Sequence, residues 1–378
     1  MMWPKRRLSI QLLEPILFLG ANQEAAPVLR GNVIVHSHRS CTLKKLSLRF
    51  DGQLTTQSVE NINDIRLKKD CQKSVAQQDL VLHPSSARSA APLLLHVGTT
   101  CFAFEMQLPE GLPESIDCQQ AKVRYNLTAS MTYRSTSSLS DTSEDCTQAV
   151  QLARLPFEGS LTGDNYSDTI DSRKHYASCC QYHVIIDSKA VALGDNLPIS
   201  IRIAPIVQNM RIKNVYLQLL ERRQVLNREE VMKTSQSCHL LHPSKDASSI
   251  ASSPLPTDDL DKPWQATMYY KIPRDADGLV HSTSTYPEFS VSHLLFVSML
   301  VSFPALTQNN NIRRVQHTIT FQTPIDLLSR NIGQLGDKDY VKLPLYGDCK
   351  SAGERIDMFD NSIHADHPPA YDDVVMTA

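Results

Sequence analysis

The stretch LKKLSLRF, residues 43–50, returns far downstream as IKNVYLQL, residues 212–219, with every apolar position kept. Over the last five residues of each segment, apolar and polar side chains alternate, which predicts a β-strand with one face in a core. A second pair, VRYNLTASM at 123–131 and VSHLLFVSM at 291–299, shares a valine, a leucine, a serine and the methionine in register. The sequence therefore predicts two divergent copies of one β domain.

No long window carries apolar residues at the three-to-four spacing of a helix, and 21 prolines interrupt most candidate helices. Many short alternating strands usually fold as sandwiches. We expect an all-β protein of two tandem immunoglobulin-like β-sandwiches. The residues expected in their cores are Leu46, Leu48, Phe50, Val123, Tyr125, Leu127, Ala129, Leu197, Ile199, Ile201, Ile203, Val215, Leu217 and Leu219.

A length of 378 residues suits two domains of about 150 residues and a tail. Polar segments rich in serine and glycine mark the joints between them. We place an N-domain at 1–156, an interdomain linker at 157–179, a C-domain at 180–330 and a short disordered tail at 331–378.

The charge is nearly balanced, with 38 Lys and Arg against 40 Asp and Glu, so nothing in the total charge favours nucleic acid as a partner. The nine cysteines lack the paired short spacings of zinc sites or compact disulfide scaffolds. Reduced cytosolic thiols explain them best.

Neither apolar segment of the chain suits a membrane span. LSIQLLEPILFLG at 8–20 is interrupted by Gln11, Glu14 and Pro15 and lacks a small-residue cleavage site, so we interpret it as strand, not signal peptide. VSHLLFVSMLVSF at 291–303 is too short to cross a bilayer as a helix. We expect a cytoplasmic protein whose membrane contact is peripheral.

No glycine-rich phosphate loop, HExxH, GxSxG or CxxC motif occurs in the chain. We therefore expect no catalytic residues, no cofactor and no metal site, hence no enzyme. The cluster CHLLH at 238–242 contains metal-ligand residue types, but it has no second cluster at finger spacing. It is interpreted as part of a polar loop.

The strongest motif lies at the C-terminus, in HPPAYDDVVMTA, where Pro368, Pro369 and Tyr371 form a PPxY sequence. Consecutive prolines pre-form a polyproline II segment, which lays its rings into an aromatic groove at low entropic cost while the tyrosine enters a second pocket. This is the pattern that WW domains bind. The alternative is a plain solvated tail.

A weaker variant precedes it in KLPLYGDC, where Leu343 replaces the first proline ahead of Pro344 and Tyr346. The flexible segment between the two motifs is long enough for both to bind neighbouring WW domains of one ligase. A ligase held on the tail would keep nearby lysines at high effective concentration, so the candidates for ubiquitin attachment are Lys338, Lys342 and Lys350.

Two serine-rich segments, 135–146 and 244–263, are expected to be loops inside the domains. Their acid-flanked or proline-directed hydroxyls are candidates for phosphorylation, and the alternative is that both segments are only soluble linkers. The candidates are Ser137, Ser138, Ser140, Thr142, Ser143 and Ser253.

The chain resembles the arrestin-related trafficking adaptors, the α-arrestins of fungi and animals, and a fungal member is favoured. LRGNVIVHSHRSCTLKKLSLRFDGQ and FAFEMQLPEGLPESIDCQQAKVRYNLTA resemble the arrestin N-domain. GDNLPISIRIAPIVQNMRIKNVYLQLLERRQV and GLVHSTSTYPEFSVSHLLFVSML resemble the arrestin C-domain. The tail is short beside those of many α-arrestins, which carry several such motifs.

The resemblance implies an adaptor that binds membrane transporters or receptors as cargo and recruits a HECT-type ubiquitin ligase through PPxY. Ubiquitin-dependent endocytosis and sorting would follow, at the plasma membrane and at endosomes or Golgi. The resemblance equally allows the adaptor's own ubiquitin to be attached to a lysine on the sandwiches instead of the tail lysines. One alternative is a ligase-independent, retromer-type sorting subunit with the same fold. Another is a secreted carbohydrate-binding or hydrolytic sandwich, which would need a signal peptide and paired carboxylates.

Overall fold

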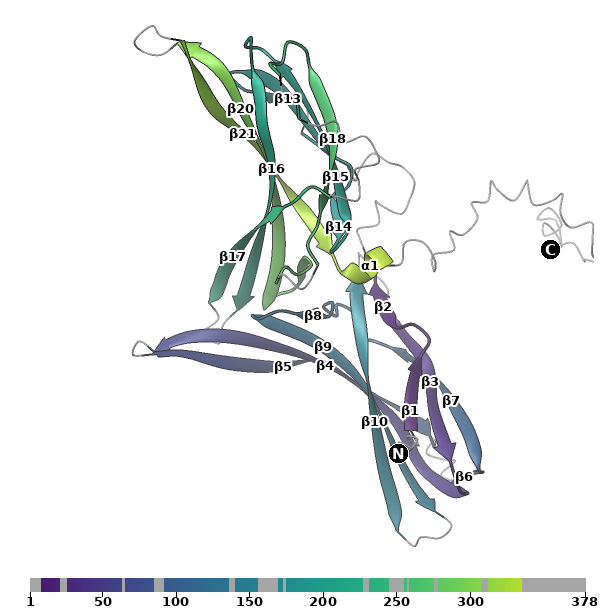
Figure 1. The fold of residues 1–378 in the computed structure, drawn as a ribbon. Helices are drawn as coiled ribbons and strands as arrows, with labels where there is room; N and C mark the ends of the chain where they lie inside the picture. The colour runs from purple at the N-terminus through teal and green to yellow at the C-terminus, as the bar shows by residue number, and fades with distance from the viewer. Residues whose placement is uncertain are drawn as a thin grey trace, which may run out of the picture. The chain divides into compact units, whose positions relative to one another are not determined.

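The structure is a computed structural model, and it describes residues 8–20, 26–62, 65–84, 92–135, 140–155, 169–172, 175–226, 231–244, 255–256, 258–274, 278–306 and 312–334. Within these ranges the chain is almost entirely β, with one short helix, α1 (Arg330–Gln334). Figure 1 shows the strands grouped into two sandwiches, which follow one another along the chain. The all-β, two-sandwich prediction is confirmed.

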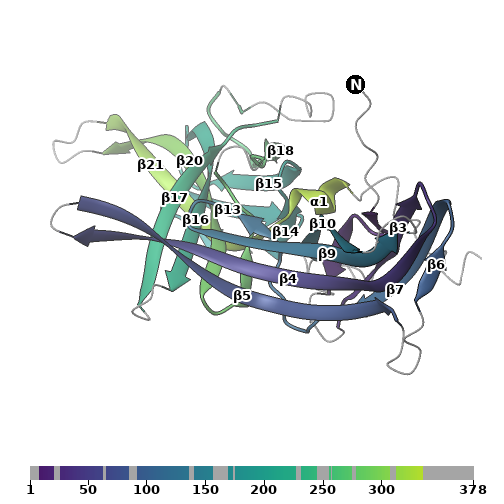
Figure 2. The ribbon, with the colours of Figure 1, turned by 90° about the horizontal axis from the view of Figure 1, so that it is seen from below.

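Among its described residues, the first sandwich has ten strands in two sheets. The smaller sheet has the order β1-β3-β7, and the larger has β2-β10-β9-β4-β5, with β6 beside β4 and β8 beside β9. Figure 2 shows β4, β5 and β9 as long neighbouring ribbons of the larger sheet. The strands are β1 (Leu8–Leu12), β2 (Ile16–Leu19), β3 (Val28–Ser37), β4 (Cys41–Ile62), β5 (Ile65–His83), β6 (Leu93–Leu95), β7 (Gly98–Gln107), β8 (Ile116–Asp117), β9 (Ala121–Ser135) and β10 (Asp141–Arg154).

The second sandwich repeats this plan. Its smaller sheet has the order β11-β13-β15-β18, with β12 beside β13, and its larger sheet has β14-β21-β20-β16-β17, with β19 beside β20. The strands are β11 (Ile170–Asp171), β12 (His175–Tyr176), β13 (Cys180–Ile186), β14 (Ala190–Ala192), β15 (Asn196–Pro205), β16 (Arg211–Leu226), β17 (Met232–Leu241), β18 (Trp264–Lys271), β19 (Thr283–Tyr286), β20 (Phe289–Leu306) and β21 (Ile312–Leu328).

The two larger sheets have the same register as well as the same order. In both, one short strand runs parallel to its neighbour, β2 beside β10 and β14 beside β21. Leu46 lies opposite Met131 on β4 and β9, and Val215 lies opposite Met299 on β16 and β20. Each pair of strands also has a register shift just before these residues. The internal repeat predicted from the sequence is therefore confirmed.

The residues predicted for the cores are all buried. Tyr125 and Phe50 stack with ring centroids 5.5 Å apart, and the Tyr125 hydroxyl donates a hydrogen bond of 2.6 Å to the carbonyl of Pro113. The segment at 8–20 forms β1 and β2, and 291–299 lies in β20, so both are strands as predicted. No helix among the described residues is long and apolar enough to cross a membrane.

Two segments that the sequence predicts to be loops contain β-strand instead. Most of 135–146 is not loop, because β10 begins at Asp141 and pairs with β9 on an exposed, polar part of the sheet. CHLLH at 238–242 lies mainly in β17 and not in a loop. Both strands are polar because water reaches their side chains there, and a burial-based pattern therefore misses them.

The joints also contain regular structure. The short strands β11 and β12 lie within the expected linker at 157–179 and pair with β13. Helix α1 occupies the start of the expected tail at 331–378, where Asn331 is buried. The rest of that tail lies outside the described residues.

Candidate functional site

The two sandwiches share a continuous apolar contact. Val225, Val280, Phe289 and Val291 of the second sandwich belong to the same buried cluster as the core of the first. Lys73 on β5 forms an ion pair with Glu288, which adds a charged contact at the rim. The second sandwich therefore packs against the first through core residues, and the joint between them is the most distinctive site that the described residues offer.

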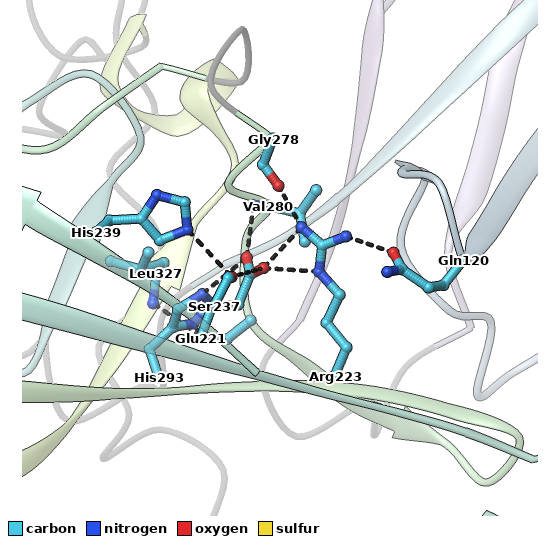
Figure 3. Close-up of polar contacts among 10 residues, drawn as sticks. Gln120, Glu221, Arg223, Ser237, His239, Gly278, Val280, His293 and Leu327 are labelled. Carbon is cyan, nitrogen blue, oxygen red and sulfur yellow. Dashed lines mark hydrogen bonds and ion pairs between the residues drawn. The ribbon is translucent and has the colours of Figure 1, made fainter. Parts of the chain in front are cut away.

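A buried polar cluster, which we call the β16 cluster, adjoins this contact (Figure 3). Its centre is the ion pair between Glu221 and Arg223, neighbours on the inner face of β16, with His293 opposite Glu221 on β20. At the equivalent cross-strand position the first sandwich has Gly52 opposite Tyr125. The register is therefore the same in both sandwiches at this position, but the second sandwich has charged residues where the first has apolar packing.

Glu221 is completely buried and accepts hydrogen bonds from several directions. Arg223 donates to one carboxylate oxygen over 2.6 Å, and the Val280 N–H donates to the other over 2.9 Å. His293 Nε2 lies 3.4 Å from that second oxygen. Burial alone raises the pKa of Glu221, but these hydrogen bonds and the Arg223 charge outweigh it and hold the pKa below its ordinary value.

Arg223 connects the sandwiches directly. Besides Glu221, its guanidinium donates to the side-chain oxygen of Gln120 in the first sandwich and to the carbonyl of Gly278 in the second (Figure 3). The planar fork of arginine suits three acceptors at once. A cavity of about 350 Å³ opens beside it, lined by Gln119, Ser235 and His239, among others.

A second cluster, which we call the β10 cluster, lies where the first sandwich ends. Arg154 on β10 donates a hydrogen bond of 2.7 Å to Asp326 on β21, and its Nε lies 3.4 Å from an oxygen of Glu114. His281 Nε2 lies 3.8 Å from the other Glu114 oxygen. Neither Glu114 oxygen is hydrogen-bonded to a donor among the described residues.

Burial dominates the titration of this second cluster. It raises the pKa of Glu114 to about 7, against the opposing effect of Arg154. Burial, with the nearby Arg154 charge, also lowers the pKa of His281 to about 4. Between these values Glu114 and His281 hold one proton between them, and it resides on the carboxyl.

Each cluster joins the sandwiches through a polar contact, Arg223 with Gln120 in the first cluster and Arg154 with Asp326 in the second, which is the chemistry of a structural joint. A buried ion pair adds little net stability, but breaking one is costly, so such pairs fix which residues meet. Among the residues that the structure describes, no group of three or more His, Cys, Asp or Glu is arranged to hold a metal ion.

Comparison with known sequences agrees with this two-sandwich arrangement. A family model described as "Arrestin (or S-antigen), N-terminal domain" matches residues 24–155, and one described as "Arrestin (or S-antigen), C-terminal domain" matches residues 178–330. Together they cover most of the chain, in the order of the two sandwiches. The chain belongs to the arrestin family.

Two curated relatives of this arrestin come from Schizosaccharomyces pombe. "Putative arrestin-related trafficking adapter C2D10.04" is 23% identical over 402 residues, which is 92% of this chain and 57% of that protein. "Putative arrestin-related trafficking adapter SPBC839.02" is 23% identical over 324 residues, 76% of this chain and 62% of that protein. The arrestin therefore spans less than two thirds of the length of either relative.

Most of the site residues predicted for this arrestin lie outside the described residues. Ser140 precedes β10, while Thr142 and Ser143 lie on it. Those outside are Pro368, Pro369, Tyr371, Leu343, Pro344, Tyr346, Lys338, Lys342, Lys350, Ser137, Ser138 and Ser253. The motif in the tail therefore stays a prediction.

The described part of the hydroxyl run has basic as well as acidic neighbours. Asp141 pairs with Lys44 at 2.6 Å and with Arg134 at 2.9 Å, which lowers its pKa. Ser143 Oγ lies 3.3 Å from Thr132 Oγ1 on β9. A phosphate in this run would therefore meet cations as well as the acidic side chains on which the sequence argument rested.

The joint itself was not predicted from the sequence. A signal was present, because the alternation through Leu217 and Leu219 continues to positions 221 and 223, which assigns Glu221 and Arg223 to the buried face. Charged residues on a buried face call for partners. Those partners, Gln120 and His293, are distant in sequence, and no pattern links them to β16.

Proposed function

We propose that this arrestin is an adaptor that binds membrane transporters or receptors as cargo and recruits a WW-domain, HECT-type ubiquitin ligase through Pro368, Pro369 and Tyr371. Cargo ubiquitination, endocytosis and sorting follow from that contact. The observation that carries the proposal is the PPxY motif in a chain of the arrestin family. Two relatives named as putative arrestin-related trafficking adapters support the trafficking role.

The joint supports the adaptor proposal because it connects the two sandwiches into one folded unit. Apolar packing through Phe289 and the Arg154–Asp326 ion pair join their ends, so a cargo segment bound to either sandwich is held by the same folded unit. In the sequence, the ligase motif at 368–371 follows that unit, whose last described residue is Gln334. In this proposal the chain has no catalytic activity, cofactor or metal of its own.

The tail supplies the remaining parts of the proposed mechanism. Leu343, Pro344 and Tyr346 form a second, weaker WW-binding segment, and Lys338, Lys342 and Lys350 are acceptors for ubiquitin. A ligase bound to the tail raises the effective concentration of these lysines at its active site. The adaptor works in the cytoplasm and is recruited to the plasma membrane and to endosomes or Golgi.

Fluorescence titration with the WW domains of a HECT-type ligase tests the contact. Tyr371→Ala removes the side chain that fills the second pocket, so we expect most of the affinity to be lost without a change in circular dichroism. Tyr340→Ala is the matched control, because this tail tyrosine has no proline two or three residues before it.

Equal affinities for the wild type and Tyr371→Ala would refute ligase recruitment through PPxY. That result, combined with cargo binding that remains intact, would favour the ligase-independent sorting subunit instead.

A further inference from the structure

The two larger sheets differ on their outer faces, although their inner faces and registers match. In the first sandwich, the outer positions at the middle of β4 and β9 are polar, and in the second sandwich the equivalent positions of β16 and β20 are largely apolar. The equivalent cross-strand pairs are Arg49 with Thr128 and Asp51 with Asn126 in the first sheet, and Gln218 with Phe296 and Leu220 with Leu294 in the second.

This apolar strip continues onto β17, the last strand of the second sheet. Leu240 lies opposite Gln218, and Cys238 lies opposite Leu220. Leu240 is 49% exposed and Leu294 is 36% exposed, and Cys238 is exposed as well. Because large apolar side chains gather here on a face that is polar in the other copy of the fold, the strip points to an interaction surface.

The β17 strand also presents a free edge. It pairs with β16 on one side, and no described strand pairs with its other side (Figure 1). Residues 232–238 are exposed on both faces, and the ten pairs with β16 run without a register shift. Lys233 is the one Lys, Arg, Asp or Glu in the strand. A long, flat and nearly uncharged edge is a template for another strand.

The equivalent edge strand of the first sandwich is protected. The β5 strand includes the charged residues Asp70, Lys73 and Asp79 among its exposed positions. Its pairing with β4 is interrupted by two register shifts, one of them beside Gly52. Charges and bulges are the usual means of blocking strand addition. One copy of the fold therefore blocks its edge, and the other leaves it open.

The inner side of β17 faces the cavity of about 350 Å³ beside the β16 cluster. Ser235, Ser237 and His239 line this cavity from β17, and Gln119 and Gln120 line it from the first sandwich. A strand added to the free edge would direct alternate side chains to this polar side and the others to the apolar strip. The two sides of the edge therefore select different side chains.

We propose that the free edge of β17 binds an extended segment of a partner protein, whose outward side chains are apolar and whose inward side chains are small and polar. Main-chain hydrogen bonds supply affinity in this mode, and pockets for alternate side chains supply specificity. The site is separate in sequence from the PPxY motif and does not depend on the ligase.

The size of the edge favours a peptide over a second copy of the chain. Ten residues of strand extend about 33 Å. Two copies that met only along this edge would bury far less than the roughly 1,200 Å² of a stable protein interface. An extended peptide needs no such area, since it pairs its backbone along the whole edge and places side chains on both faces.

A synthetic decapeptide of alternating valine and serine, with fluorescein and two glutamates at one end for solubility, is the probe. Fluorescence anisotropy with the full chain measures its affinity. We expect saturable binding, and we expect N-methylation of one alternate set of residues to abolish it while N-methylation of the other set is tolerated, because only one edge of the peptide pairs with β17. If both N-methylated peptides bound as tightly as the unmodified peptide, strand addition would be refuted.

Leu240→Lys places a charge beside the free edge and should raise the dissociation constant at least tenfold. Val81→Lys on β5 is the matched control, because Val81 has the same 49% exposure at the edge of the other sheet. The affinity of this variant for the peptide should equal that of the wild type. Cys238→Lys is a second test at the same strip. Unfolding midpoints equal to the wild type confirm that each variant is folded.

Three results would overturn the proposal. The first is that the wild type does not bind the peptide at millimolar concentration, and the second is that Leu240→Lys and Val81→Lys weaken peptide binding equally. The third is a dimer in sedimentation that Leu240→Lys dissociates, since a second copy of the chain would then occupy the edge. Tyr371→Ala should bind the probe as the wild type does, so failure here is independent of ligase recruitment.

Discussion

Arg223 is the cation that neutralises a fully buried carboxylate. Arg223→Leu introduces the residue that the first sandwich carries at the equivalent position, Leu54, but it leaves Glu221 without its ion pair. Removal of one partner of a buried pair costs about 3 to 5 kcal/mol. We expect the midpoint of urea unfolding to fall correspondingly.

The neighbouring Arg222 provides the control, because it lies on the outer face of the same strand and is exposed. Arg222→Leu should change the free energy of unfolding by no more than about 0.5 kcal/mol. The double variant Glu221→Gln, Arg223→Leu should recover part of the loss. Equal midpoints for Arg222→Leu and Arg223→Leu would contradict the role assigned to the pair.

Glu114 and His281 predict a particular dependence of stability on pH. The Glu114 pKa is raised, so its contribution is present below its ordinary value of 4.5 and is lost as the pH rises through about 7. The His281 pKa is lowered, so its contribution is present above 6.5 and is lost as the pH falls through about 4. The two effects nearly cancel between 4.5 and 6.5.

Glu114→Gln removes only the first of these contributions. As the pH rises from 6 to 8.5, the free energy of unfolding of this variant should increase by about 1 kcal/mol relative to that of the wild type. The reason is that only the wild type must ionise a buried carboxyl in this range. Urea unfolding at the two pH values measures the difference. A gap between the two proteins that is independent of pH would show that Glu114 does not titrate in this range.

At the scale of strands, the sequence predicts the strands that have one buried face and misses the strands that are exposed to water on both faces. The alternation of Leu46, Leu48 and Phe50 identifies β4 because one face must be apolar. The repeat even preserves the register shift next to Lys45 and Asn214. By contrast, β17 and the start of β10 are exposed on both faces, so their residues resemble those of a loop.

The hydroxyl run before and within β10 is the regulatory element that we propose. Phosphorylation there should weaken cargo engagement without affecting the PPxY contact, because each phosphate adds about −1.5 to −2 charges to the end of the hairpin. Asp141 already pairs with Lys44 and Arg134, so new phosphates would also compete for these cations. The change to test is alanine at Ser137, Ser138, Ser140, Thr142 and Ser143.

Cargo uptake under nutrient-rich and starved conditions measures the effect of these alanines. We expect the variant to retain cargo engagement in the condition where the wild type loses it. Uptake identical to the wild type in both conditions would show that the run is a plain connection between β9 and β10.

At the scale of the whole molecule, the repeat and the alternation were sufficient to predict two sandwiches in order along the chain. The joint between them was not predictable, because it depends on pairs such as Arg154 with Asp326 and Arg223 with Gln120. Each of these residues is ordinary in its own strand, and only the folded chain brings the partners together. The PPxY motif of the tail, by contrast, can be recognised in the sequence alone, because it consists of neighbouring residues.

Ubiquitin transfer tests the central claim most directly. The wild type, Tyr371→Ala and Tyr340→Ala are each incubated with a WW-domain HECT-type ligase, and mass spectrometry measures diglycine remnants on the chain. We predict remnants on tail lysines, among them Lys338, Lys342 or Lys350, in the wild type and Tyr340→Ala, and a loss of most of that signal in Tyr371→Ala. Equal modification of all three proteins, or no remnant on the wild type with an active ligase present, would contradict recruitment through PPxY.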